Sequence, residues 1–136
     1  MHILSLCKGL VASVFFLTCF MFSQLSAGAL NSKTECTALS KRFEYQCIAI
    51  IFEDGEYLIG QKGTVGATMP SMSMAHNVKP VIFKEIKNMS GHYSYTIQLE
   101  MHGVWMMAYD ILEPIRGRAM EKLNFDYEGS QSTNNQ

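Results

Sequence analysis

The sequence lacks a charge excess, a high cysteine content and a recognisable catalytic constellation. Its 136 residues hold 11 lysine and arginine residues against 12 aspartate and glutamate residues, a formal net charge of −1. This balance excludes a generally basic nucleic-acid binder and an acidic tail. Four cysteines are too few for a disulfide-dense mini-protein. No Ser-His-Asp ordering, paired acid–base carboxylates or phosphate-cradling glycine loop can be assembled, so the sequence predicts a protein that is not an enzyme.

Residues 1–29 have the layout of a secretory signal peptide. An apolar stretch without a charged residue runs over residues 9–22, and the small residues Ala27-Gly28-Ala29 fit an A-x-A cleavage site. We therefore expect export to the periplasm or another extracytoplasmic compartment, with a mature chain that begins near Leu30 and forms one small domain. The alternatives are an uncleaved anchor in the inner membrane at residues 9–22, which is short for a span of roughly 20 residues, and a lipoprotein anchor at Cys19.

Removal of this segment leaves two cysteines, Cys36 and Cys47. In an oxidising compartment, two cysteines are most simply interpreted as one disulfide. A bridge that closes a loop of roughly 10–15 residues stabilises the fold by about 3 kcal/mol. A metal-binding or redox pair is the rival interpretation, but the spacing is not that of a Cys-x-x-Cys motif.

Apolar and polar residues alternate with a period of two over much of the remaining chain, which is typical of half-buried strands. The alternation is clearest from Tyr93 to Met101 and from Trp105 to Ile111. Pro80 predicts an edge or a bulge in the strand expected at 78–86. Several short strands at this spacing predict an all-β sandwich over residues 47–128. The other expected elements are a helical or irregular lead-in at 30–46, strands at 47–52, 57–59 and 123–127, a loop at 60–68 that ends in one short strand, and a disordered tail at 129–136.

One segment, residues 69–77, breaks this alternation and is rich in sulfur. If it is extended, Met72, Met74 and His76 lie on one face, two residues apart each time. Thioethers are neutral and polarizable, so these ligands favour Cu(I) over hard cations and over zinc. Met69 supplies a further candidate sulfur. The structural alternative is a methionine-rich loop that only caps the open end of the sandwich.

Two residues outside this segment are weaker candidates. His102 stands at the end of an expected strand, where it either approaches the loop or serves only as a turn residue. Trp105 is the only tryptophan, and it either stacks on a bound cation or belongs to the core, which is the commoner position for a tryptophan in a sandwich.

Three stretches between Gly66 and Phe125 resemble the YtkA-like and FixH families of exported or membrane-attached β domains. They are MPSMSMAHNVKP at 69–80, GHYSYTIQLEMHGVW at 91–105 and DILEPIRGRAMEKLNF at 110–125. The resemblance implies an immunoglobulin-like β-sandwich outside the cytoplasmic membrane, with a role in copper handling or in the assembly of copper-containing oxidases. It implies ligand roles for Met69, Met72 and His76, and it does not extend to residues 31–60.

These features together predict a periplasmic Cu(I)-binding or copper-handling accessory protein with Met69, Met72, Met74 and His76 as ligands. The expected partner is a membrane transport or oxidase-assembly protein; no nucleic acid is expected, and membrane contact only through an uncleaved signal segment. The alternative function is a metal-free interaction module of a membrane efflux or oxidase-assembly complex, which would dock through exposed methionines. A redox enzyme that uses Cys36 and Cys47 is a third hypothesis.

Overall fold

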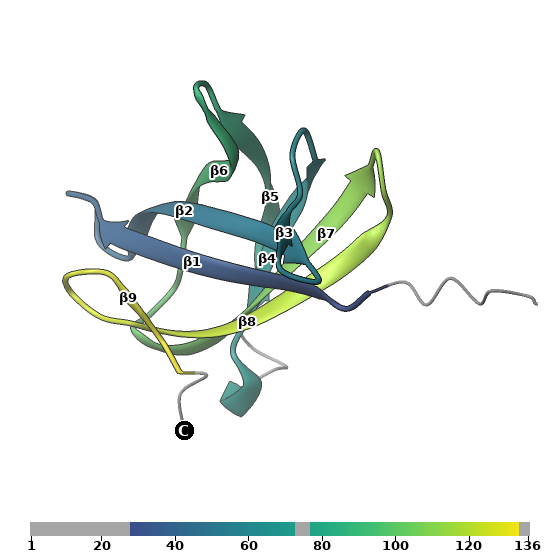
Figure 1. The fold of residues 1–136 in the computed structure, drawn as a ribbon. Coiled ribbons are helices and arrows are strands. Elements are labelled where there is room, and N and C mark those ends of the chain that lie inside the picture. Colours follow the sequence, from purple (N-terminus) through teal and green to yellow (C-terminus); the bar gives the residue numbers. More distant parts are fainter. Residues whose placement is uncertain (1–27, 73–76, 134–136) are drawn as a thin grey trace, which may run out of the picture.

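A computed structural model describes residues 28–72 and 77–133 of the chain. The predicted signal peptide lies outside these ranges except for its last two residues. Within the described ranges, no helix combines the length and the apolarity needed to cross a membrane. The regular structure there consists of nine strands and one short 3-10 helix, so the prediction of an all-β protein is confirmed (Figure 1).

The strands pair antiparallel into one continuous, nearly closed sheet. Its order is β1-β2-β6-β5-β4-β7-β8-β9, and β3 pairs with β2 beside this path. The elements are β1 (Leu30–Ala38), β2 (Glu44–Glu53), β3 (Glu56–Tyr57), β4 (Lys62–Thr68), η1 (Pro70–Met72), β5 (Asn77–Ile86), β6 (Met89–Gln98), β7 (Gly103–Glu113), β8 (Gly117–Phe125) and β9 (Ser130–Ser132).

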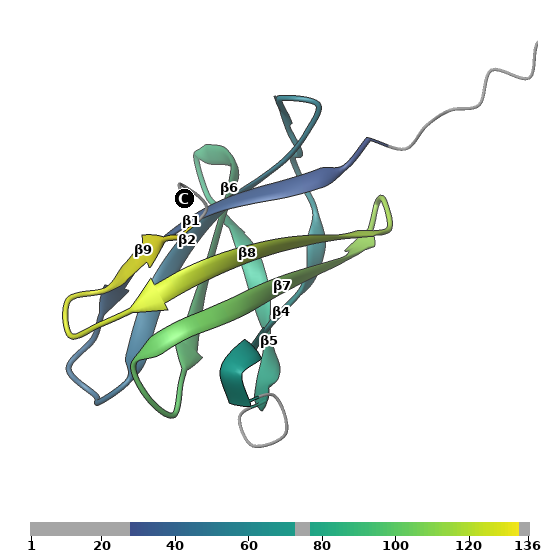
Figure 2. The same cartoon turned by 90° about the horizontal axis from the view of Figure 1, so that it is seen from below.

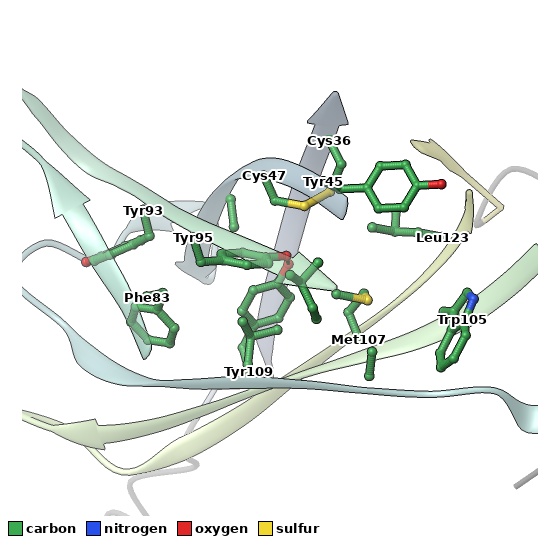
Figure 3. Close-up of a cluster of buried hydrophobic side chains, with 14 of the residues drawn as sticks. Cys36, Tyr45, Cys47, Phe83, Tyr93, Tyr95, Trp105, Met107, Tyr109 and Leu123 are labelled. Atoms are coloured by element: carbon green, nitrogen blue, oxygen red, sulfur yellow. Dashed lines mark hydrogen bonds between the residues drawn. A yellow bond between two sulfur atoms is a disulfide. The ribbon is translucent and has the colours of Figure 1, made fainter. Parts of the chain in front are cut away.

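The core comes from the inward residues of the alternating strands. The alternation expected for β6 and β7 is confirmed, because every second side chain is buried along both strands. Figure 3 shows the aromatic part of this core, in which rings from β5, β6 and β7 converge. The buried residues expected from the sequence are Tyr93, Tyr95, Ile97 and Leu99 on the first stretch, and Trp105, Met107, Tyr109 and Ile111 on the second.

Strand β5 passes from one half of the sheet to the other. Its first part pairs with β4 up to the pair Gly63–Phe83, and its last part pairs with β6 from the pair Lys84–Ser94 onward. The β4–β5 register shifts between Val65 and Ala67, opposite the segment that contains Pro80. A proline cannot donate to a ladder and so favours such an irregularity, and the predicted bulge is confirmed.

Strand β1 closes the sheet against β8 and β9, and Figures 1 and 2 both show it alongside β8. The closure uses side chains and turn backbone instead of a full ladder. Cys36 N donates to Ser130 Oγ at 3.0 Å, Ala38 N donates to Glu128 O at 2.8 Å, and Thr37 forms an isolated bridge with Gly129. These contacts give hydrogen-bond partners to backbone groups along the edge of β1 that faces away from β2.

Three local expectations were wrong. Residues 30–38 form strand β1 and not a helical or irregular lead-in, and all nine residues of β1 pair with β2. Residues 62–68 form the full strand β4, although a loop was expected over most of 60–68. Residues 130–132 form strand β9 on β8 where a disordered tail was expected.

The predicted Cys36–Cys47 disulfide is present. The two residues are direct partners in the β1–β2 ladder, with a Cα–Cα distance of 4.1 Å. So short a distance is typical of a pair whose N–H groups point away from the neighbouring strand. This explains why Cys36 N is available to Ser130.

Candidate functional site

The methionine-rich loop joins β4 to β5 and is closed at its base, because Thr68 and Asn77 are direct partners in the β4–β5 ladder. The loop begins with the turn η1, in which Met72 N donates to Met69 O at 3.0 Å. Backbone over residues 70–72 is therefore wound into a 3-10 turn and is not extended as the sequence interpretation assumed. The turn lies close to β7, and Figure 2 shows it at one end of the sheet.

The two candidate ligands in the described part of the loop differ in depth. Met69 is only 3% exposed and belongs to the core. Its Cε lies 3.2 Å from the position that a Cβ on Gly103 would occupy, so its side chain reaches the β6–β7 turn. Met72 is 43% exposed. Met74 and His76 lie outside the described residues.

Carboxylate, imidazole and thiol groups are the other side chains that could bind a metal ion. Within residues 28–72 and 77–133, no group of three or more His, Cys, Asp or Glu residues is arranged to hold a metal ion. Cys36 and Cys47 are bonded to each other in the disulfide, so neither presents a free thiol.

His102 lies at the same end of the sheet, but among aromatic side chains. Its ring stands edge-on to Phe43 at 4.8 Å and to Tyr127 at 4.2 Å between centroids. Backbone N–H groups of Gly129 and Glu128 hold the pKa of the nearby Asp126 below its usual value, and the charge of His102 lowers it slightly further. The sequence interpretation of His102 as a turn residue did not anticipate these partners, because they come from the β1–β2 and β8–β9 turns.

A buried polar cluster connects β1, β6, β7 and β8 and was not anticipated from the sequence. Thr34 Oγ1 lies 2.5 Å from the hydroxyl of Tyr109, which lies 2.7 Å from the hydroxyl of Tyr95. Thr34 N donates to Glu121 Oε1 at 3.2 Å. Burial is the main cause that raises the pKa of both tyrosines, which stay neutral and hydrogen-bonded. The hydroxyl groups of Thr34, Tyr95 and Tyr109 therefore form a neutral cross-link between β1, β6 and β7.

Glu121 is the one carboxyl group in this cluster and is incompletely satisfied. Its side chain is 2% exposed, and neither its Oε2 nor the buried Oγ of Ser32 has a hydrogen-bond partner. Burial raises the pKa of Glu121, while hydrogen bonding by Thr34 and smaller effects of Ser32 and Lys33 oppose the rise. Because burial disfavours the charged carboxylate, the folded state favours the protonated form of Glu121 more than the unfolded chain does.

Glu121→Gln is expected to raise the free energy of unfolding at pH 7 by about 1 kcal/mol and to change it little near pH 4. Because the pKa of folded Glu121 lies above its usual 4.5, the stability from its protonated form is present below that pH and is lost as pH rises through the raised pKa. Glutamine still accepts from Thr34 and does not ionise.

Urea unfolding of both proteins at a series of pH values measures this effect. Glu56→Gln, at an exposed carboxyl on β3, is the matched control. A stability difference between wild type and Glu121→Gln that stays constant from pH 4 to pH 7 would show that Glu121 does not hold its proton in the folded state.

Comparisons of the chain with protein-family models, with curated proteins and with solved structures find no match.

Proposed function

We propose that this chain is an exported accessory protein that binds Cu(I) at the loop over residues 69–76 and passes it to another protein without covalent chemistry. One observation carries the proposal. The loop leaves and re-enters the sheet at the paired residues Thr68 and Asn77, with Met72 exposed beside this base. The candidate donors Met72, Met74 and His76 all stand between these paired residues in the sequence, which reduces the entropy lost when they converge on an ion.

The donors divide into two roles in this proposal. Met72, Met74 and His76 bind the ion, and Met69, which is buried against the β6–β7 turn, anchors the loop in the core. Two thioethers and an imidazole are neutral, so they bind a monovalent soft ion without trapping it by charge. Release to a partner then proceeds by exchange of one ligand at a time.

The same proposal includes a place in the cell and a partner. The Cys36–Cys47 disulfide fits an oxidising, extracytoplasmic compartment. The proposed mature chain begins near Leu30, where β1 also begins, so cleavage after residue 29 leaves that strand whole; an uncleaved anchor at residues 9–22 would place the same domain at the inner membrane. The partner in this proposal is a membrane transport or oxidase-assembly protein.

We also propose the finer fold and the family that the sequence resemblance implies, namely an immunoglobulin-like sandwich of the YtkA-like and FixH type. In this interpretation β1, β2 and β6 form one layer and β4, β7 and β8 the other. Strand β5 supports this division, because it pairs with β4 in its first part and with β6 in its last. Strands that switch layers in this way are a known feature of sandwiches.

Titration of the exported protein with Cu(I), in competition with a colorimetric Cu(I) chelator, tests the metal proposal. We expect one Cu(I) per chain, and a loss of affinity of at least roughly tenfold in the Met72→Ala, Met74→Ala double variant, since even residues that only support a metal ligand contribute that much. The matched control replaces Met89 and Met120 with alanine; these are 44% and 54% exposed and lie on strands.

Equal affinity in the loop variant and in the wild type would end the copper proposal for this loop. Equal losses in the loop variant and the strand variant would indicate unspecific binding to exposed thioethers.

A further inference from the structure

From Cys47 to Phe52, strand β2 is apolar on both faces, unlike its neighbours. Its inward residues Cys47, Ala49 and Ile51 are fully buried. Ile48, Ile50 and Phe52 alternate with them and point outward, and Ile48 is 40% exposed. An antiparallel strand with one solvated face normally alternates apolar with polar residues. The outward apolar residues of β2 are therefore typical of a surface that binds another molecule.

This outward row borders a groove. Ile48 and Ile50 line a hollow of about 350 Å³ together with Met89 and His92. A second hollow of about 240 Å³ adjoins it, since both share Lys33 and Ile50 as lining residues. Phe52 and Tyr57 extend the apolar surface at that side. The outward apolar row thus runs from Ile48 to Phe52 on β2 and continues onto Tyr57 and Met89. We call this surface the β2 face (Ile48, Ile50, Phe52, Tyr57 and Met89).

Two opposite charges flank the β2 face on β1. Lys33 is the direct ladder partner of Ile50, and Glu35 is the partner of Ile48. The two charged residues are exposed and stand two positions apart on the same side of β1, so both point outward beside the apolar row. Each cross-strand row therefore has one isoleucine and one charge, and the sign of the charge changes from one row to the next.

We propose that the β2 face binds a second copy of this chain through a two-fold axis. The axis lies between the two copies and is perpendicular to the strands. It passes between the Lys33–Ile50 pair and the Glu35–Ile48 pair. This operation reverses the strand direction, so Lys33 meets the partner's Glu35 and Glu35 meets the partner's Lys33. It also places Ile48 against the partner's Ile50. An isologous interface requires such self-complementarity. Sheets that pack face to face lie about 10 Å apart, and their side chains interdigitate between them.

The charges select a second copy over an unrelated occupant. Lys33 and Glu35 stand symmetrically about the midpoint between Ile50 and Ile48, so this part of the surface complements itself. The net charge is −1 for the whole chain and −2 for the chain from Leu30 onward, which lacks Lys8, so repulsion between copies is small. The proposal does not depend on copper binding, because the metal loop lies on the β4–β7 side of the sheet and contributes nothing to the β2 face.

Sedimentation equilibrium of the exported protein tests this inference. We expect a dimer in the wild type and a dissociation constant raised by at least about tenfold in Ile48→Lys, because a lysine would be buried in the interface. Ile82→Lys is the matched control, since Ile82 is 68% exposed and lies on β5, away from the β2 face. Circular dichroism confirms that each variant is folded.

Charge reversal tests the geometry itself. Lys33→Glu and Glu35→Lys should each weaken the dimer, because each brings like charges together, and the double variant should restore it. A wild type that stays monomeric at about 100 μM, equal weakening by Ile48→Lys and Ile82→Lys, or a double variant weaker than both single variants would each overturn the proposal.

Discussion

Replacing Cys36 and Cys47 together with alanine is expected to lower the free energy of unfolding by about 3 kcal/mol. The two residues are 11 positions apart, and their bond restricts the unfolded chain in the region that becomes the β1–β2 hairpin. Without the bond, the unfolded chain gains conformations while the folded ladder stays possible. For a domain of this size the midpoint of thermal unfolding should fall by on the order of 10 °C.

Urea unfolding with and without a reductant separates the bond from the packing of the two sulfur atoms. The reductant should destabilise the wild type by a similar amount and leave the double variant unchanged. The matched control replaces Thr37 and Gln46, the next pair in the same ladder, with alanine. Its free energy of unfolding should fall by less than about 1 kcal/mol. A wild type whose stability does not respond to the reductant would contradict the prediction.

The parts of the fold that could be predicted are those where local pattern and burial agree. Along β6 and β7, apolar and polar residues alternate without a break, so the pleat alone decides which side chains enter the core. Pro80 likewise acts locally, since its missing N–H interrupts a ladder wherever the strand lies. The conformation of these segments can therefore be predicted without knowing which distant residues they contact.

The parts that could not be predicted depend on partners far along the chain. Strand β1 contains few apolar residues, and Thr34 faces inward because its hydroxyl meets that of Tyr109, 75 positions away. Strand β9 is short and polar, and its place follows from the ladder with β8. A sequence pattern registers apolar burial, so a polar strand held by hydrogen bonds looks like a loop.

The candidate site was predictable in its composition and not in its geometry. The loop sequence identifies thioether and imidazole donors, whereas the turn η1 sets Met72 apart from the buried Met69. A 3-10 turn has a period of three, so an argument from extended backbone does not hold over residues 70–72. The buried polar cluster of Thr34, Tyr95, Tyr109 and Glu121 could not be predicted either, because its members come from four strands that are distant in sequence.

Trp105→Ala is expected to lower the free energy of unfolding by about 3–5 kcal/mol, and Val104→Ala by less than about 1 kcal/mol. Trp105 is fully buried opposite Leu123, and its Nε1 donates to Met101 O at 3.2 Å, which holds the β6–β7 turn. Val104 precedes it on the outward face and is 39% exposed.

The comparison of these neighbours tests the register of the whole strand, because a slip by one residue would exchange the two faces of β7. A loss of about 3–5 kcal/mol is comparable to the total stability of some domains, so Trp105→Phe serves as a second variant. It keeps an aromatic ring but lacks the N–H that donates to Met101 O. Its loss in the free energy of unfolding should fall between those of the two alanine variants. Urea unfolding of all three measures the order. A larger loss for Val104→Ala than for Trp105→Phe would place the tryptophan on the solvent side, and the inward tyrosine and methionine of β7 would have to leave the core with it.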